Sequence, residues 1–161
     1  MKLQKNTRLA LYSVLEFART PARHIAAAEI AAKYRVSAHH LAKVLAELAR
    51  SGILASVRGA GGGYRFTGNA KRLTLLDIIQ RFEEFDDAVP SQAGGSATPV
   101  ETALGAVLSE IDANAKATFG SITLATMMRL IDRRNGEVAY APAPSDQPSA
   151  TARRQSAVNA A

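Results

Sequence analysis

The stretch AEIAAKYRVSAHHLAKVLAELARSGILASVRGAGGGYRF, residues 28–66, decides the fold. Its first part predicts a helix over 27–34, a short break, and a second helix over 38–50. Ser37 stands just before the second helix, where its hydroxyl can accept a hydrogen bond from a backbone N–H of the first turn. Apolar residues recur along this helix at intervals of three and four, which predicts one buried face. These residues are Leu41, Val44, Leu45 and Leu48.

A glycine-rich hairpin follows the second helix. Gly52 is expected to end that helix, because glycine tolerates the left-handed backbone of a helix C-terminus. Residues 53–57 and 64–66 have the character of two short strands, and the run 59–63 between them supplies the positive φ angles that a tight turn needs. Helix, turn, helix and hairpin together predict a winged helix-turn-helix, whose second helix enters the DNA major groove.

Two further helices flank this core in the sequence. An amphipathic helix is expected over 7–19, ending at Thr20-Pro21 because proline disfavours a helical residue before it. Another is expected over 75–85, with Thr74 as its N-cap. Residues 1–85 are therefore predicted to form one domain, mainly α with a small β-hairpin wing.

The second half of the chain has a different composition. Residues 86–99 are rich in Gly, Pro, Ser and Ala and predict a loop. Residues 100–134 are expected to hold a long helix that ends at about residue 119, followed by a short final helix. Residues 135–161 are expected to be disordered. One apolar stripe follows the long helix. Its members are Leu104, Val107, Leu108, Ile111, Ala115 and Phe119.

Charge is distributed unevenly along the 161 residues. Residues 1–82 contain 14 Lys/Arg and 4 Asp/Glu, whereas residues 83–161 contain 6 Lys/Arg and 10 Asp/Glu. A basic half joined to an acidic half favours one surface that faces a polyanion. The chain has no cysteine, which excludes disulfides, thiolate metal sites and cysteine nucleophiles. No stretch reaches the ~20 apolar residues of a membrane span, so a cytoplasmic protein is expected.

The candidate DNA contacts lie on three of the predicted elements. On the second helix of the motif, His39 and Lys43 are expected to reach bases or phosphates, because lysine can donate to guanine O6 and N7 and histidine can donate or accept. Arg58 beside the glycine tip can enter a narrow minor groove. Cations at the start of the first helix can neutralise phosphates. The full set is Ser37, His39, His40, Lys43, Arg58, Gly61, Gly62, Arg65, Lys5 and Arg8, with Lys2 beside the last two.

Several other kinds of site are disfavoured by the same residues. No Gly-Lys-Ser/Thr follows the glycines, so they do not form a phosphate-binding P-loop. His39 and His40 are adjacent in a helix and point about 100° apart, which disfavours a shared metal ion, and His24 stands alone. Glu83-Glu84 and Asp86-Asp87 are expected to be a solvated helix end and not an acid/base pair. No enzyme is expected. A winged helix that binds protein or RNA remains an alternative.

The chain resembles the IscR/NsrR-type regulators of the Rrf2 family over about residues 1–133. The most specific resemblance is SVRGAGGGY, residues 56–64, followed by LTLLD, residues 73–77. The resemblance implies a homodimeric transcription regulator, taken here as a repressor, on a palindromic operator. It implies that the long helix crosses its two-fold mate and buries the apolar stripe. It also implies a minor-groove contact for Arg58 and base-reading positions at His39, Ala42 and Lys43.

One departure from the family concerns its iron–sulfur cluster. The three cluster cysteines of many members align with Ser91, Ser96 and Thr102, and Arg8 stands near the helix position where some members add a carboxylate ligand. Alcohols remain protonated and are poor ligands for such clusters. A protein without cluster or other cofactor is therefore expected. The three residues are then ordinary loop and cap residues, or Ser91 and Ser96 replace cysteines by engineering. A further hypothesis is that the 86–99 loop senses a small molecule or a partner protein.

Overall fold

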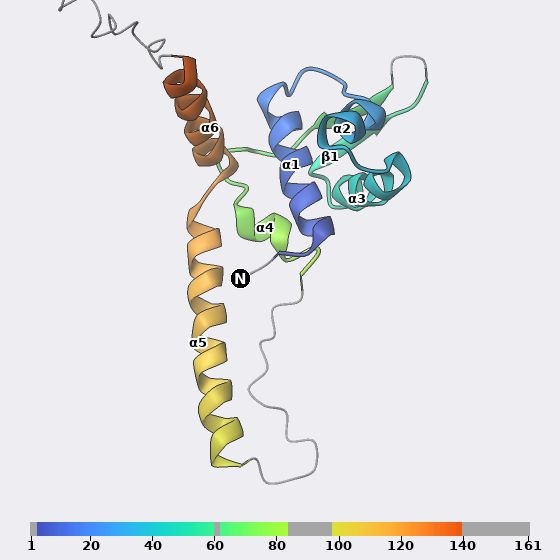
Figure 1. The fold of residues 1–161 in the computed structure, drawn as a ribbon. Helices are drawn as coiled ribbons and strands as arrows, with labels where there is room; N and C mark the ends of the chain where they lie inside the picture. Colours follow the sequence, from blue (N-terminus) through green and yellow to red (C-terminus); the bar gives the residue numbers. More distant parts are fainter. Residues whose placement is uncertain (1–2, 60–61, 84–97, 140–161) are drawn as a thin grey trace, which may run out of the picture. The chain divides into compact units, whose positions relative to one another are not determined.

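The computed structural model describes residues 3–59, 62–83 and 98–139. The fold is mainly helical with one two-stranded antiparallel sheet, as predicted (Figure 1). The elements in chain order are α1 (Lys5–Arg19), α2 (Ala27–Tyr34), α3 (Ala38–Arg50), β1 (Leu54–Val57), β2 (Gly63–Phe66), α4 (Leu75–Ile79), α5 (Pro99–Ser121) and α6 (Leu124–Ala139). The chain divides into one unit over residues 1–130 and another over residues 131–161, and α6 begins in the first unit.

The helix-turn-helix forms as predicted, and its turn has two local causes. Arg35 ends α2 in the left-handed conformation, with φ of 52°, and its N–H donates to the carbonyl groups of the last turn. Ser37 begins α3 by accepting a hydrogen bond from the His40 N–H at 3.4 Å. The four apolar residues predicted for the buried face of α3 are all buried in the core. The orientation of α3 is therefore fixed by packing on one face and by its cap.

The hairpin is anchored to the loop before α2. Leu54 pairs with Phe66 and Val57 with Gly63. Beyond this pairing, Ile25 and Tyr64 exchange two backbone hydrogen bonds, of 3.0 and 2.9 Å. A Cβ on Gly63 would lie 2.5 Å from the Ile25 carbonyl oxygen, so this close approach of backbones requires glycine. The wing is thus held to the helix-turn-helix through the backbone of the loop before α2.

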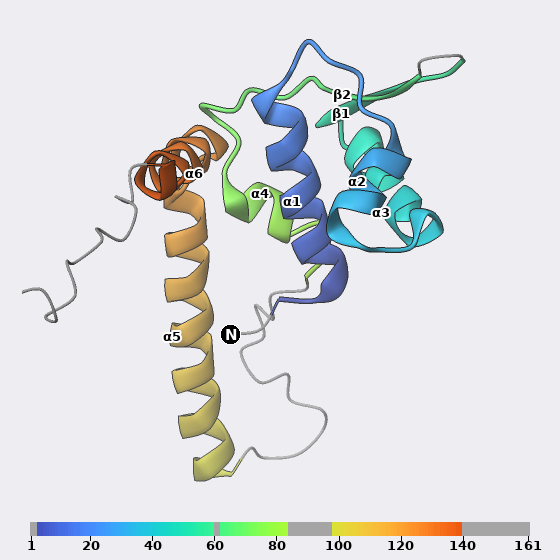
Figure 2. The same ribbon diagram turned by 45° about the horizontal axis from the view of Figure 1, so that its top comes forward.

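Helix α1 lies between α4 on one side and the α2–α3 pair on the other, as both views show (Figures 1 and 2). Its buried residues contribute much of the core, including Val14 and Phe17. A polar brace adds to the contact with α2: the Glu16 carboxylate accepts hydrogen bonds from Lys33 at 2.6 Å and from the Tyr34 hydroxyl at 2.7 Å. Burial alone would raise the pKa of Glu16, but the bonds from Lys33 and Tyr34 outweigh it and hold this pKa below its usual value.

The end of α4 differs from the prediction. The helix stops at Ile79 instead of extending to 85, because the N–H groups of Arg81 and Phe82 turn back to carbonyls three residues earlier, in tighter turns than an α-helix makes. The prediction of a solvated end at Glu83 is also wrong. The Glu83 carboxylate accepts hydrogen bonds from the Gln4 N–H at 2.6 Å and from the buried Thr7 hydroxyl at 2.7 Å. It therefore caps the N-terminus of α1 from 76 residues away or more.

Glu83→Ala is expected to lower the free energy of unfolding by about 1–2 kcal/mol, the upper part of the range for loss of a helix cap. The substitution leaves the buried Thr7 hydroxyl without its acceptor, and a buried unsatisfied donor is destabilising. Urea unfolding followed by circular dichroism measures the change. Glu29→Ala is the control, because Glu29 forms an exposed ion pair with Arg23 and should contribute about 0.5 kcal/mol or less. Equal effects of the two substitutions would contradict the capping role.

Helices α5 and α6 are joined to the winged domain through the segment before α4. Thr74 and Thr123 form an isolated β-bridge, and the Leu75 N–H donates to the Ile122 carbonyl at 2.9 Å. The start of α5 is set by a capping box between Thr98 and Glu101.

Helix α6 continues to Ala139, so the expected disorder from residue 135 begins too early. A single glycine costs a helix only about 1 kcal/mol, which explains why Gly136 does not end it.

Candidate nucleic-acid interface

The exposed face of α3 is a line of small and basic side chains opposite the buried stripe. His39, Lys43 and Arg50 are exposed and recur at intervals of four and seven residues, which places them on one side of the helix. Ala42 and Ala46 lie between them and are also exposed. Such a face, with long donors separated by alanines, can approach the floor of a major groove closely.

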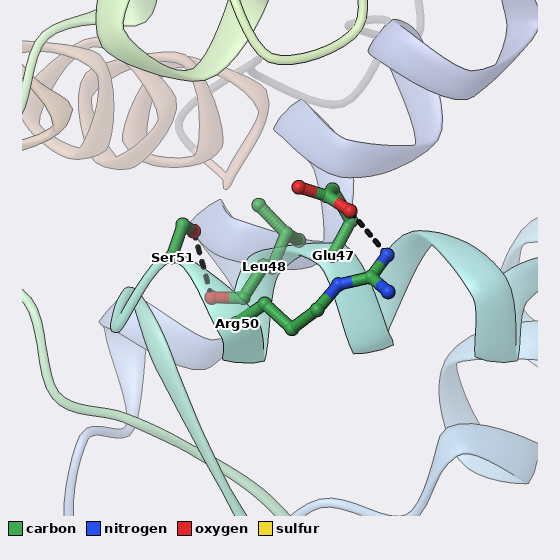
Figure 3. A network of polar contacts seen from close by, with 4 residues as sticks. All are labelled: Glu47, Leu48, Arg50 and Ser51. Carbon is green, nitrogen blue, oxygen red and sulfur yellow. Dashed lines mark hydrogen bonds and ion pairs between the residues drawn. The ribbon is translucent and has the colours of Figure 1, made fainter.

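Arg50 was not among the residues predicted from the sequence. Its side chain is 72% exposed and forms an ion pair with Glu47, one turn earlier on α3 (Figure 3). In the same turn the Ser51 hydroxyl donates to the Leu48 carbonyl at 2.9 Å and satisfies one of the last carbonyls of the helix. The signal that could have identified Arg50 is its seven-residue spacing from Lys43.

Ser37 and His40 differ from His39 in their surroundings. The Ser37 oxygen is occupied as a cap acceptor, although its hydroxyl remains exposed and can still donate to a phosphate. His40 is half-buried on the flank of α3, and its Nε2 atom is buried without a hydrogen-bond partner. Of the two adjacent histidines, His39 is therefore the one presented to solvent on the outer face.

The wing presents two exposed arginines. Arg58 directly follows β1, and Arg65 lies on β2 opposite Ala55. Gly62 is required by the fold of the tip, because a Cβ there would lie 2.4 Å from the Val57 carbonyl oxygen. Gly61, also predicted as a DNA contact, lies outside the described residues. In the described part of the wing, the two arginines therefore lie near the base of the tip, and the tip itself requires glycine at position 62.

The predicted cations on these elements are left uncompensated. Within the described residues, none of them forms an ion pair with a carboxylate, in contrast to Arg23, Lys33 and Arg50. The uncompensated set is Lys5, Arg8, Lys43, Arg58 and Arg65. Lys2 lies outside the described residues. Unpaired cations on one domain favour binding of a polyanion, because each can release a counterion from DNA.

Helix α5 exposes most of its apolar stripe. Leu104, Val107, Leu108 and Ile111 are each 53–56% exposed, and Val100, which the sequence reasoning missed, is 74% exposed. No residue of α5 is fully buried within this single chain. The C-terminal end of the predicted stripe is less exposed: Ala115 is half-buried and Phe119 packs against the hydrophobic core. A contiguous exposed apolar stripe on a long helix is a feature of protein–protein contact.

Comparison with known proteins identifies the family. The family model of Rrf2, described as an iron-dependent transcriptional regulator, matches residues 3–130. The chain belongs to the Rrf2 family. It is 46% identical over 143 residues to a protein of Rhodopseudomonas palustris named as the HTH-type transcriptional regulator BadM, a match that covers 88% of this chain and 90% of the relative. It is 31% identical over 96 residues to IscR of Vibrio campbellii, covering 59% of this chain and 57% of that protein.

Solved structures of Rrf2-type regulators have the same winged fold. IscR of T. potens superposes with a TM-score of 0.70 at 22% identity, over 87% of this chain and 97% of that one. CymR, the global cysteine regulator of B. subtilis, superposes with a TM-score of 0.67 at 24% identity, over 81% and 98%. This chain is accordingly an Rrf2-family, DNA-binding transcriptional regulator, and its relatives are regulators, not enzymes. None of the helices in the described ranges combines the length and apolar character that a membrane span requires.

The Rrf2 family description refers to iron, but a thiolate-bound iron–sulfur cluster does not fit the donor atoms of this chain. The 161 residues contain no cysteine thiolate. Of the three aligned cluster positions, Ser91 and Ser96 lie outside the described residues, and Thr102 donates its hydroxyl to the Thr98 carbonyl at 3.2 Å on an exposed turn of α5. Within residues 3–59, 62–83 and 98–139, no three His, Asp or Glu side chains gather as metal ligands. A neutral alcohol held by a helix carbonyl cannot replace thiolate at such a cluster.

Proposed function

We propose that this protein is a repressor that binds a palindromic operator as a homodimer and holds no iron–sulfur cluster. The observation that carries the proposal is the coexistence of two exposed surfaces with opposite character. One is the uncompensated basic face of α3 and the wing, and the other is the apolar stripe of α5. The first suits DNA and the second suits a second copy of the chain.

In this proposal α3 lies in the major groove and the wing reaches the adjacent minor groove. Lys43 and His39 contact base edges, and Arg58 enters the minor groove, where negative potential is highest when the groove is narrow. Lys5, Arg8 and Arg65 contact phosphates, which position the domain without reading sequence. Ser37 and His40 flank these contacts at the N-terminal turn of α3.

The homodimer is supported by the exposure of the α5 stripe. Burying four large aliphatic side chains against the same four of a partner would remove apolar surface from water. Each Å² of apolar surface buried in this way would stabilise the dimer by about 25 cal/mol. A two-fold contact of this kind repeats the DNA-reading domain twice, so the operator is expected to be palindromic. Repression is the simplest consequence, because a dimer that occupies a promoter excludes polymerase without further parts.

Of the residues proposed from the sequence to sense an effector, 86–99, those from 86 to 97 lie outside the described residues, as does the tail from 140. Thr98 and Pro99 belong instead to the capped start of α5. Without a cluster, regulation of this protein has to use another chemistry or be absent. The proposal that the loop binds a small molecule or partner protein rests on its position alone.

Selection of genomic fragments by the purified protein tests the proposed function. Double-stranded DNA fragments that share an inverted repeat are expected to be enriched from sheared genomic DNA at about 0.15 M salt. Enrichment of RNA, or of no DNA sequence above random fragments, would instead favour a winged helix used as an RNA- or protein-binding module.

A further inference from the structure

A cavity lies on the flank of α3, next to the face that is proposed to read bases, and Lys43 belongs to both. It is open to solvent and is lined by the first turn of α1 at Asn6, by the flank of α3 from His40 to Arg50, and by the turn after α4 at Arg81 and Phe82. Its volume is about 240 Å³. At roughly 30 Å³ per water molecule, this is room for a small solute and not for a drug-sized ligand.

The charges in the cavity wall are unbalanced. Lys43, Arg50 and Arg81 line it together with one carboxylate, that of Glu47. Arg50 is paired with this carboxylate, whereas Lys43 and Arg81 form no ion pair with any described residue. Two cations in the wall of one small cavity repel each other, and an anion between them removes this repulsion.

Two further hydrogen-bonding side chains line the cavity. Asn6 brings an amide, and His40 an imidazole whose Nε2 is buried with no partner in the described residues. Buried polar atoms in folded proteins generally have a partner, so this nitrogen indicates an incomplete polar site next to the cavity. The apolar side chains of Val44 and Phe82 form the remaining wall. Lysine, arginine, amide and imidazole together are the donors that bind oxyanions.

We propose that this cavity is an oxyanion site that takes a phosphate or carboxylate group through Lys43 and Arg81. The group has two sources, a backbone phosphate of bound DNA or a small free anion. Lys43 belongs to both the cavity and the proposed base-reading face, so a free anion in the cavity competes with DNA. The DNA source rests on the proposed function, whereas binding of a free anion does not depend on it.

The first arm of the test uses inorganic phosphate and the full chain without DNA. Titration with phosphate at constant pH and ionic strength, with chloride as the balancing anion, is followed by NMR of the His40 ring and the Arg81 side chain. A saturable shift is expected in the wild type, with about tenfold weaker binding in Arg81→Gln, because a charge-assisted contact is lost. Arg72→Gln is the matched control: Arg72 is also exposed but does not line the cavity, and its variant should bind like the wild type.

The second arm measures the salt dependence of binding to random double-stranded DNA. If a backbone phosphate occupies the cavity, Arg81→Gln should reduce the slope of log affinity against log salt by about 1, and Arg72→Gln should not. If a free anion occupies it, phosphate should weaken DNA binding more than chloride does at equal ionic strength, and Arg81→Gln should abolish this difference. An effect specific to Arg81 in either arm supports the site, and the second arm identifies the source of the anion. No saturable shift and identical slopes for the two variants would overturn the inference, while operator binding by the wild type would leave the proposed function standing.

Discussion

Ile111→Asp is expected to yield a folded monomer whose affinity for the operator is at least about 100-fold below that of the wild type. Ile111 is 56% exposed at the centre of the α5 stripe, between Leu108 and the half-buried Ala115. A carboxylate there cannot be buried against a second apolar helix without a large desolvation cost. Losing the dimer removes the second half-site contact, and linked binding events exceed single ones by about 10²–10⁴-fold.

Ala113→Asp is the matched control for this substitution. Ala113 is exposed two residues along the same helix, about 200° around its axis from Ile111, and the variant introduces the same charge. Light scattering after size exclusion gives the mass of each variant, and fluorescence anisotropy gives its affinity for a selected DNA fragment. The interface assignment fails if Ile111→Asp remains a dimer, or if both variants lose the dimer equally.

Arg58→Ala is expected to weaken operator binding by about 10- to 100-fold, the effect of losing one specific arginine contact of 1–3 kcal/mol. Its exposed side chain at the base of the wing is placed to enter a minor groove, where negative potential attracts a guanidinium most strongly when the groove is narrow. Because the contact depends on groove shape, the loss should be larger for a fragment with A·T pairs at the wing position than for one with G·C pairs there.

Arg72→Ala serves as the control for the wing, since it removes an exposed arginine from the turn before α4. Its affinity should stay within about threefold of the wild type, because distant surface charges are screened at physiological salt. Equal losses for Arg58→Ala and Arg72→Ala would mean that the wing contributes only general charge and does not enter a groove.

The parts of the fold that the sequence predicted well are those determined by local signals. The bounds of α2 and α3 follow from apolar spacing and from Ser37, and the hairpin follows from its glycines. The end of α4 was predicted six residues too late, because no local pattern reveals that Glu83 turns away to cap α1. Contacts between segments 76 or more residues apart carry no periodicity that a sequence can display.

The candidate site shows the same division. His39, Lys43 and Arg58 could be chosen from helix spacing and from the position of the wing tip. Arg81 could not, because its role depends on a cavity formed by α1, α3 and the turn after α4. Phe119, predicted as a member of the apolar stripe of α5, also packs against the core of its own chain, a contact that the spacing along one helix does not reveal.

The second half of the chain does not carry the ligands that an iron–sulfur cluster needs. The Rrf2 description refers to iron, yet thiolate ligands are absent from the sequence and Thr102 uses its hydroxyl within α5. The DNA-reading half needs none of that chemistry. A site formed by Lys43 and Arg81 beside the recognition helix would give the protein a direct way to couple a small anion to DNA binding.

The most direct measurement of the central claim is the affinity of the wild type for a genomically selected fragment, compared with a shuffled fragment of the same length and composition at about 0.15 M salt. We expect a preference of at least about 10³-fold for the selected fragment, the lower end for specific regulators, with two chains bound per fragment. Equal affinity for the two fragments would contradict sequence-specific binding, and a single bound chain per fragment would contradict the homodimer.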